Sequence, residues 1–168
     1  MVFPGDRKPS SFFQNQLVEI ELQGKKQRVI FHYKPDPRTT EDLLKSDEGR
    51  ALNDILSEFS QLSLANKITP VVVFTPIVAH IYAKYTTPGS GQDWRNDQNQ
   101  TKASLDHIRG LVKALAESNH IKFIDLVPPF MERAAKGEFL YYPFETHWNS
   151  AGRQAAAEYV GSALQGIQ

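Results

Sequence analysis

The chain has 168 residues, of which 40% are hydrophobic and 23% are charged, and it contains no cysteine. This length and composition predict one globular domain over residues 1–168, and the missing cysteines exclude disulfides, thiol catalysis and thiolate metal sites. Since 19 basic residues balance 19 acidic residues, the formal net charge is zero, which gives no electrostatic basis for binding nucleic acid or an anionic membrane.

The first part of the chain, residues 1–16, is polar and contains prolines, so an irregular lead-in is expected there. This stretch does not resemble a signal peptide. No apolar run approaches the roughly 20 residues that a membrane-spanning helix requires. We therefore expect a soluble chain without a membrane span, and the sequence indicates no particular compartment.

Residues 17–33 show two β-rich runs separated by a short polar turn. The first run alternates, with Val18, Ile20 and Leu22 on one side and acidic residues between them. Alternation of this kind is typical of a half-buried strand, and the turn at Gly24 predicts a β-hairpin. We expect this hairpin to add to the edge of a larger sheet.

Residues 41–165 alternate between helical and strand patterns and are expected to form an α/β core. Helices are predicted over residues 41–64, 77–85, 101–118, 130–136 and 149–164, and strands over residues 70–75 and 120–126. The run from Pro70 to Thr75 has no polar alternation, which predicts a central parallel strand buried on both faces. This order favours a three-layer, flavodoxin-like sheet with helices on both faces and a site at the carboxyl ends of its strands.

Apolar residues recur three and four positions apart in the predicted helices and indicate their inner faces. The stripe of the first helix is Leu52, Ile55, Leu56, Phe59 and Leu62, and that of the last helix is Ala155, Ala156, Tyr159, Val160, Ala163 and Leu164.

The loop before the last helix carries the strongest functional pattern. Glu145 lies two residues before His147, and a helix start is expected at Asn149 or Ser150. A short loop can aim an imidazole into a cleft, and a nearby carboxylate can orient it, which predicts a catalytic pair. Alternatively, His147 binds the backbone and Glu145 is a surface charge near a helix N-terminus. For Trp148, the two interpretations are packing and stacking on a substrate.

Other candidate residues lie where the predicted strands end. His80 follows the strand over residues 70–75 and is a candidate for the rim of a substrate site, together with Trp148. Asp125 ends the other strand and is expected to cap the next turn. The remaining histidines have no metal-ligand spacing, so no metal site is expected: they are His32, His107 and His120.

The segment Glu145-Thr146-His147-Trp148-Asn149-x-x-Gly152 resembles the last sequence block of the SGNH (GDSL-type) hydrolases. It is most similar to the Asp-x-His-Trp-Asn-x-x-Gly variant of SGNH-like sugar O-acetyltransferases, which include the alginate acetylation proteins. The resemblance extends over residues 66–164. It implies an SGNH-like α/β fold, His147 as general base, Glu145 as the residue that orients it, an acyl ester substrate such as an acylated carbohydrate, and no cofactor.

Two departures from the family pattern bear on the activity. Position 145 is glutamate instead of aspartate, and no Gly-Asp-Ser block follows a hydrophobic strand. Gly5-Asp6-Arg7 has arginine where the nucleophile would stand. The remaining serine candidates in predicted loops are Ser10, Ser11 and Ser90.

Two interpretations follow from this combination of features. The first is the C-terminal portion of an SGNH-type serine esterase or acyltransferase, with a His–carboxylate pair but no visible nucleophile. Its small sheet would be completed by an upstream domain, by a partner chain or by the hairpin. The alternative is a non-catalytic SGNH-like module that binds carbohydrate or protein.

Overall fold

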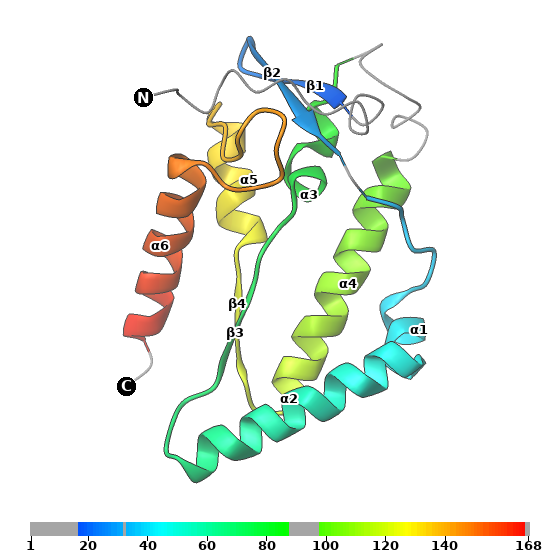
Figure 1. Ribbon diagram of the computed structural model, residues 1–168, viewed down its shortest axis with the longest axis vertical. Coiled ribbons are helices and arrows are strands. Elements are labelled where there is room, and N and C mark those ends of the chain that lie inside the picture. Colours follow the sequence, from blue (N-terminus) through cyan, green and yellow to red (C-terminus); the bar gives the residue numbers. More distant parts are fainter. Residues whose placement is uncertain (1–16, 32, 88–97, 167–168) are drawn as a thin grey trace.

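The computed structural model describes residues 17–31, 33–87 and 98–166. In chain order its elements are β1 (Leu17–Leu22), β2 (Lys25–Ile30), α1 (Thr40–Lys45), α2 (Asp47–Ala65), β3 (Val71–Phe74), α3 (Val78–Tyr82), the 3-10 helix η3 (Ala83–Tyr85), α4 (Gln98–Ser118), β4 (Lys122–Asp125), α5 (Val127–Ala135) and α6 (Ser150–Gln165) (Figure 1). The expected lead-in over residues 1–16 and the candidates Ser10, Ser11, Ser90 and His32 lie outside the described residues.

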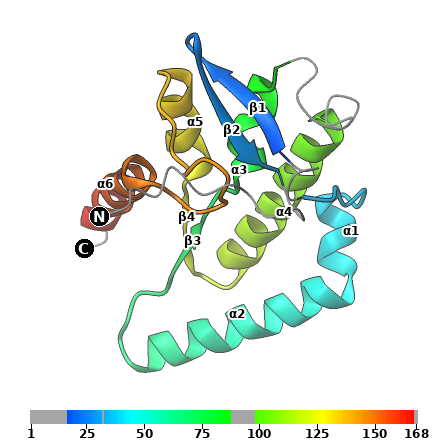
Figure 2. The ribbon, with the colours of Figure 1, turned by 45° about the horizontal axis from the view of Figure 1, so that its top comes forward.

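Strands β3 and β4 form a parallel pair in which Val71 aligns with Lys122 and Phe74 with Asp125. Helix α4 lies on one side of the pair and α5 and α6 lie on the other (Figures 1 and 2). The chain is therefore an α/β protein with the helix–strand order that the sequence predicts. In the part of the chain that the structure describes, no further strand joins this pair.

The prediction that β3 is buried on both faces is wrong for the described residues. Val73 is 36% exposed, and the other residues of the strand are only half-buried. The run is apolar enough for a central strand, but among the described residues β4 is its only strand partner. A complete three-layer sheet is therefore not formed by these residues.

The hairpin is confirmed, with β1 and β2 paired antiparallel from Leu17 opposite Ile30. Its expected position is wrong, because it forms a separate sheet that lies across the ends of α3 and α5 (Figure 1). The inward residues Val18, Ile20 and Leu22 are buried in one cluster with Tyr82, Phe130 and Tyr141. The apolar face of the hairpin thus covers helices rather than extending the parallel sheet.

The helix predicted over residues 41–64 is divided into α1 and α2 at Ser46. The Ser46 hydroxyl donates to the Leu43 carbonyl (2.8 Å) and accepts from the Gly49 N–H (3.1 Å). It therefore caps both helices. A Cβ at position 49 would overlap the Leu43 carbonyl oxygen, so only glycine allows this close turn.

The predicted inner stripes of α2 and α6 are only partly buried. On α2, Leu56 is buried, but Ile55, Phe59 and Leu62 are exposed while Ser60 and Ser63 face inward. On α6, Ala155 and Ala156 are buried, and Tyr159 and Leu164 are exposed. The described residues therefore bury only part of each apolar stripe.

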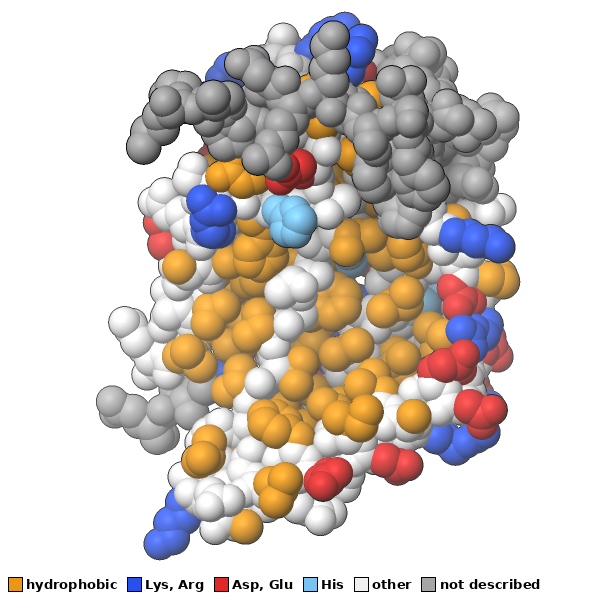
Figure 3. Space-filling model, viewed as in Figure 1, with side chains coloured by type: hydrophobic (Ala, Val, Ile, Leu, Met, Phe, Trp, Pro, Cys, Tyr) orange, Lys and Arg blue, Asp and Glu red, His pale blue; other side chains and the backbone are white. Residues whose placement is uncertain are grey.

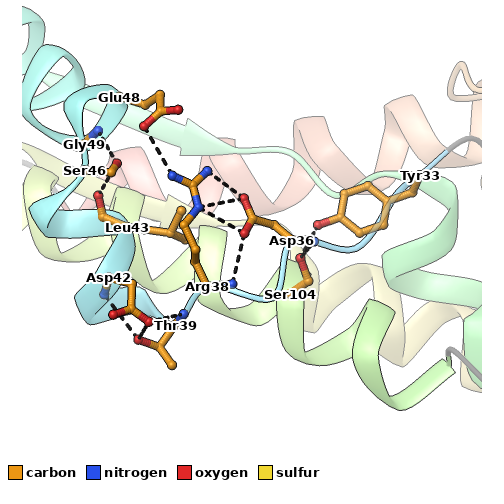
Figure 4. Close-up of polar contacts among 10 residues, drawn as sticks. All are labelled: Tyr33, Asp36, Arg38, Thr39, Asp42, Leu43, Ser46, Glu48, Gly49 and Ser104. Atoms are coloured by element: carbon orange, nitrogen blue, oxygen red, sulfur yellow. Dashed lines mark hydrogen bonds and ion pairs between the residues drawn. The ribbon is translucent and has the colours of Figure 1, made fainter.

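The linker between β2 and α1 is held against α4 by Ser104 (Figure 4). The Ser104 hydroxyl lies 2.6 Å from the Tyr33 hydroxyl and accepts from the Asp36 N–H at 2.8 Å. The Arg38 guanidinium donates to both carboxylate oxygens of Asp36 and reaches Glu48. These Arg38 hydrogen bonds lower the pKa of Asp36 to about 2. The linker therefore joins the hairpin to the helical layer through a fixed polar network.

We expect Ser104→Ala to lower the free energy of unfolding by about 1–3 kcal/mol, because it leaves the Asp36 N–H and the Tyr33 hydroxyl without their buried partner. Tyr33→Phe removes only one of these bonds and should cost about 1 kcal/mol or less. Urea unfolding of both variants measures the difference. Equal losses in the two variants would contradict a bridging role for Ser104.

Candidate functional site

The loop that carries His147 spans residues 140–149 and closes on itself. Its ends meet where the Asn149 N–H donates to the Leu140 carbonyl (3.0 Å), and the Tyr142 N–H donates to the His147 carbonyl (3.1 Å). The Leu140 N–H in turn donates to the buried Tyr82 hydroxyl (2.7 Å). We call residues 140–149 the His147 loop.

Two buried tyrosines hold the His147 loop at the carboxyl end of β3. The Tyr141 hydroxyl donates to the Pro76 carbonyl (2.8 Å), and the Tyr82 hydroxyl donates to the Glu138 carbonyl (3.4 Å). Burial raises the pKa of both phenols, so both remain protonated donors at neutral pH. The His147 loop therefore lies beside Pro76, directly after the carboxyl end of β3.

The hairpin also supports the His147 loop. The Gln27 side-chain amide donates to the Tyr141 carbonyl (3.1 Å), and the Phe144 N–H donates to the Arg28 carbonyl (3.3 Å). Phe144 has a φ of 60°, in the left-handed region, at the tip of the loop. The conformation of the loop is therefore fixed from both of its sides.

The start of α6, which directly follows the His147 loop in the sequence, also holds the loop in place. Asn149 is the N-cap, and its side-chain oxygen accepts from the Gly152 N–H (3.0 Å). Its amide group donates to the Phe139 carbonyl (2.6 Å) and the Tyr141 carbonyl (3.3 Å). A Cβ at Gly152 would overlap the Leu140 carbonyl oxygen, so glycine permits the close approach of helix and loop. The predicted helix start is confirmed, with Asn149 as the N-cap.

Trp148 lies at the base of the His147 loop and packs against the core. Its ring centroid is 5.1 Å from that of Phe130, and its carbonyl accepts from the Arg153 guanidinium (3.1 Å). The indole is half-buried. This position accounts for the packing role, and the predicted contact of Trp148 with substrate stays a prediction.

His147 and Glu145 lie together at the surface. The Nδ1 of His147 is 3.8 Å from the Oε2 of Glu145, and the side chains are 84% and 37% exposed. This separation is longer than a hydrogen bond. No hydrogen bond joins the imidazole to a hydroxyl group among the described residues. The described residues thus supply a histidine and its carboxylate, and they do not supply a nucleophile.

His80 is buried near the carboxyl end of β3 and does not line an open surface there. Its Nε2 lies 3.2 Å from Asp106 Oδ1, and its ring meets Phe74 edge-on. Its Nδ1 has no hydrogen-bond partner among the described residues. Burial lowers the pKa of His80, against the opposing effect of Asp106. A contact with substrate stays a prediction, because the side chain is buried in the structure.

A charged cluster around His80 has no counterpart in the sequence-based analysis. Asp106 accepts from Lys102 (2.5 Å), and Arg109 donates to Asp125 (2.6 Å). Lys102, Asp106 and Arg109 are spaced four and three residues apart on α4, and this spacing could have indicated them from the sequence. Asp125 also accepts from the Val127 N–H (2.9 Å), so its predicted role as a cap is confirmed.

This cluster borders a cavity of about 750 Å³ between α4, β4 and α6. Its lining includes Asp106, Arg109, Lys113, Lys122, Asp125 and Tyr159. None of the lining residues belongs to the His147 loop, so the cavity is separate from the candidate catalytic pair. The described residues contain no group of three or more potential metal ligands, and no described helix is long and apolar enough to cross a membrane.

The chain was compared with known protein families, curated proteins and solved structures. A family model described as "SGNH hydrolase-like domain, acetyltransferase AlgX" matches residues 39–167. No curated protein and no solved structure matches the chain. The matched region contains β3, β4 and the His147 loop, and it excludes the hairpin.

We expect Gly152→Ala to lower the free energy of unfolding by about 1–3 kcal/mol, because its methyl group would overlap the Leu140 carbonyl. Gly161→Ala on the same helix is the matched control, since a Cβ there meets no atom within 4 Å. The control should stabilise the protein by up to about 1 kcal/mol. Thermal and urea unfolding give both values, and equal effects would contradict the close helix–loop approach.

The buried His80 should make stability depend on pH. Because its pKa is lowered in the folded state, its neutral form contributes fully above the unfolded pKa of about 6.5. That contribution is lost as the pH falls from about 6.5 towards the folded pKa. We expect His80→Gln to reduce this loss and the exposed-site control His147→Gln to retain it. Urea unfolding between pH 7.5 and pH 5 tests this, and an unchanged profile in His80→Gln would contradict it.

Proposed function

Since the chain belongs to the family of SGNH hydrolase-like domains of the acetyltransferase AlgX type, we propose that it forms the histidine-bearing part of a serine acyl-transfer site. The observation that carries this proposal is the pairing of His147 with Glu145 on a loop fixed at the carboxyl end of β3. Parallel α/β sheets place their reactive groups at this end.

In the proposed reaction, His147 accepts the proton of a serine hydroxyl through Nε2 while the serine oxygen attacks an acyl carbonyl. The ester bond then breaks, and His147 returns the proton to the leaving alcohol. An acceptor hydroxyl or water reverses these steps and releases the serine. Glu145 would accept a hydrogen bond from Nδ1–H and stabilise the imidazolium.

The geometry of the free chain is compatible with this role, although the pair is loose. At 3.8 Å, Glu145 and His147 are within ion-pair distance, and catalytic hydrogen bonds often tighten only when substrate binds. The glutamate is one methylene longer than the aspartate typical of the family pattern, which extends its reach. The serine and the oxyanion donors would come from outside the described residues.

The proposed substrate is an acyl ester, with carbohydrate as the carrier of the acyl group. This assignment rests on the family, because the cavity between α4, β4 and α6 does not include the His147 loop. A fixed loop with an open imidazole also suits a non-catalytic carbohydrate-binding or protein-interaction module. The high exposure of His147 and the absence of a described nucleophile beside it favour that second candidate.

Hydrolysis of p-nitrophenyl acetate, combined with a serine-directed organophosphonate, tests the proposal. The chain is assayed alone and together with the serine-bearing segment of another family member. A general base contributes about 10²–10⁴-fold in rate, so His147→Ala should lower turnover by that factor and abolish serine labelling. Glu145→Gln should have a smaller effect in the same direction.

The matched control is His120→Asn, since His120 is exposed and has a φ of 58°, a conformation that asparagine tolerates. This variant should retain full turnover. Absence of any His147-dependent turnover or labelling in both assays would contradict the acyl-transfer proposal and leave the binding module.

A further inference from the structure

The cavity between α4, β4 and α6 is large enough to hold a small-molecule ligand. Its volume of about 750 Å³ lies in the range of protein sites for such ligands. Residues 121–125 of β4 and the turn before it all line the cavity, and α4 and α6 line it from the two sides of β4 (Figure 1). We call this cavity the α4–α6 groove. It lies apart from the His147 loop, so any ligand in it has a role of its own.

The charged side chains of the α4–α6 groove balance one another. Three are basic and three are acidic: Arg109, Lys113, Lys122, Asp106, Glu117 and Asp125. Arg109 donates to Asp125 (2.6 Å). The Lys122 ammonium donates to the Ala163 carbonyl (2.9 Å) in the last turn of α6, where the helix dipole favours a cation. A ligand of either charge would meet like charges on the same walls, which weakens its binding. The groove therefore favours an uncharged ligand.

Two ion pairs on α4 are too wide for a direct hydrogen bond. Arg109 Nη1 lies 3.8 Å from Asp106 Oδ1, and Lys113 Nζ lies 3.8 Å from Glu117 Oε1. Direct N–H···O hydrogen bonds are only about 2.7–3.2 Å long. Each pair thus presents a donor and an acceptor to one ligand group that accepts from the cation and donates to the carboxylate. A hydroxyl group has both properties.

The spacing of these two pairs sets the length of the ligand. Asp106 and Lys113 are seven residues apart on α4, which at 1.5 Å per residue places the pairs about 10 Å apart along the helix. A single sugar ring is shorter than this separation. A ligand that reaches both pairs therefore carries hydroxyl groups on more than one linked ring.

Helix α6 adds an aromatic side chain to the groove. Tyr159 is 40% exposed and lines the groove opposite α4. Phe123 of β4 also lines it and is half-buried. An exposed aromatic ring packs against an apolar surface and leaves polar groups at the edge of that surface free to hydrogen-bond. The C–H face of a sugar ring, with hydroxyl groups around its edge, fits this combination.

We propose that the α4–α6 groove binds a short uncharged oligosaccharide, about two or three sugar units long. Its hydroxyl groups bridge the Asp106–Arg109 and Lys113–Glu117 pairs, and one of its rings packs on Tyr159. The proposal goes beyond the proposed function, because it involves neither His147 nor a serine nor an acyl group.

Calorimetric titration of the whole chain tests the ligand class. The probes are maltotriose, cellotriose, xylotriose and mannotriose, each beside its monosaccharide, and trigalacturonic acid as the anionic trimer. We expect at least one uncharged trimer to bind. Its monosaccharide and the anionic trimer should bind at least about tenfold more weakly. In NMR spectra, the amides of Gly110 and Phe123 should shift on binding, because both residues line the groove.

Substitutions with matched controls test the contacts. Lys113→Ala removes one hydroxyl-binding pair and Tyr159→Ala removes the aromatic ring, so each should lower the affinity at least about tenfold. Tyr159→Phe keeps the ring and should bind like the unaltered chain. Lys45→Ala is the control for loss of a lysine, since Lys45 also has a glutamate four residues away, Glu41, and does not line the groove. Urea unfolding verifies that each variant is folded.

Each outcome has a distinct meaning. Absence of saturable binding by every uncharged trimer overturns the proposal, as does tighter binding of the anionic trimer. Binding that shifts only the amides of the His147 loop also overturns it, although it supports the carbohydrate assignment of the proposed function. Binding in the groove without any His147-dependent turnover supports this proposal and contradicts only the proposed function.

Discussion

The hydrogen bond from the Tyr141 hydroxyl to the Pro76 carbonyl (2.8 Å) is the contact on which the candidate site depends. It is buried and joins the His147 loop to the end of β3, two elements that are 65 residues apart in the chain. If this bond is lost, the buried phenol or carbonyl has no hydrogen-bond partner, which lowers the free energy of unfolding. The Leu140–Tyr82 bond and the hairpin contacts support the same junction. The position of His147 is therefore set by the core rather than by the loop alone.

The second constraint is that the chain has more apolar surface than its described residues bury. A two-stranded parallel pair is small for a sheet, and parallel strands are normally buried on both faces. Here β4 is the partner on one side of β3, and the other side is open among the described residues. Exposed apolar residues also follow α2, and apolar side chains gather on the face of the molecule that Figure 3 shows. The described residues therefore leave apolar surface on both β3 and α2 exposed.

Sequence patterns identified most elements because local periodicity and capping chemistry determine them. The hairpin, both parallel strands, α4, α6 and the Asn149 cap were predictable in this way. The division at Ser46 was missed because the apolar stripe that predicts this helix begins only at Leu52, beyond the serine whose two hydrogen bonds end α1. Periodicity also could not show that Ile55 and Phe59 are exposed. An apolar stripe indicates which helix face tends to be buried, but it does not indicate which other segment packs against that face. The burial of His80 against Asp106 depends on tertiary contacts.

The exposure of His147 sets a condition on the proposed function. An imidazole that is 84% exposed competes with water for its protons and for its contact with Glu145, and electrostatic stabilisation is strongest where water is excluded. Catalysis at this histidine therefore requires a nucleophile and also a cover. If His147 stays open to solvent when substrate is present, the loop is better explained as a scaffold for binding. The effect of His147→Ala on turnover and on serine labelling distinguishes these two roles.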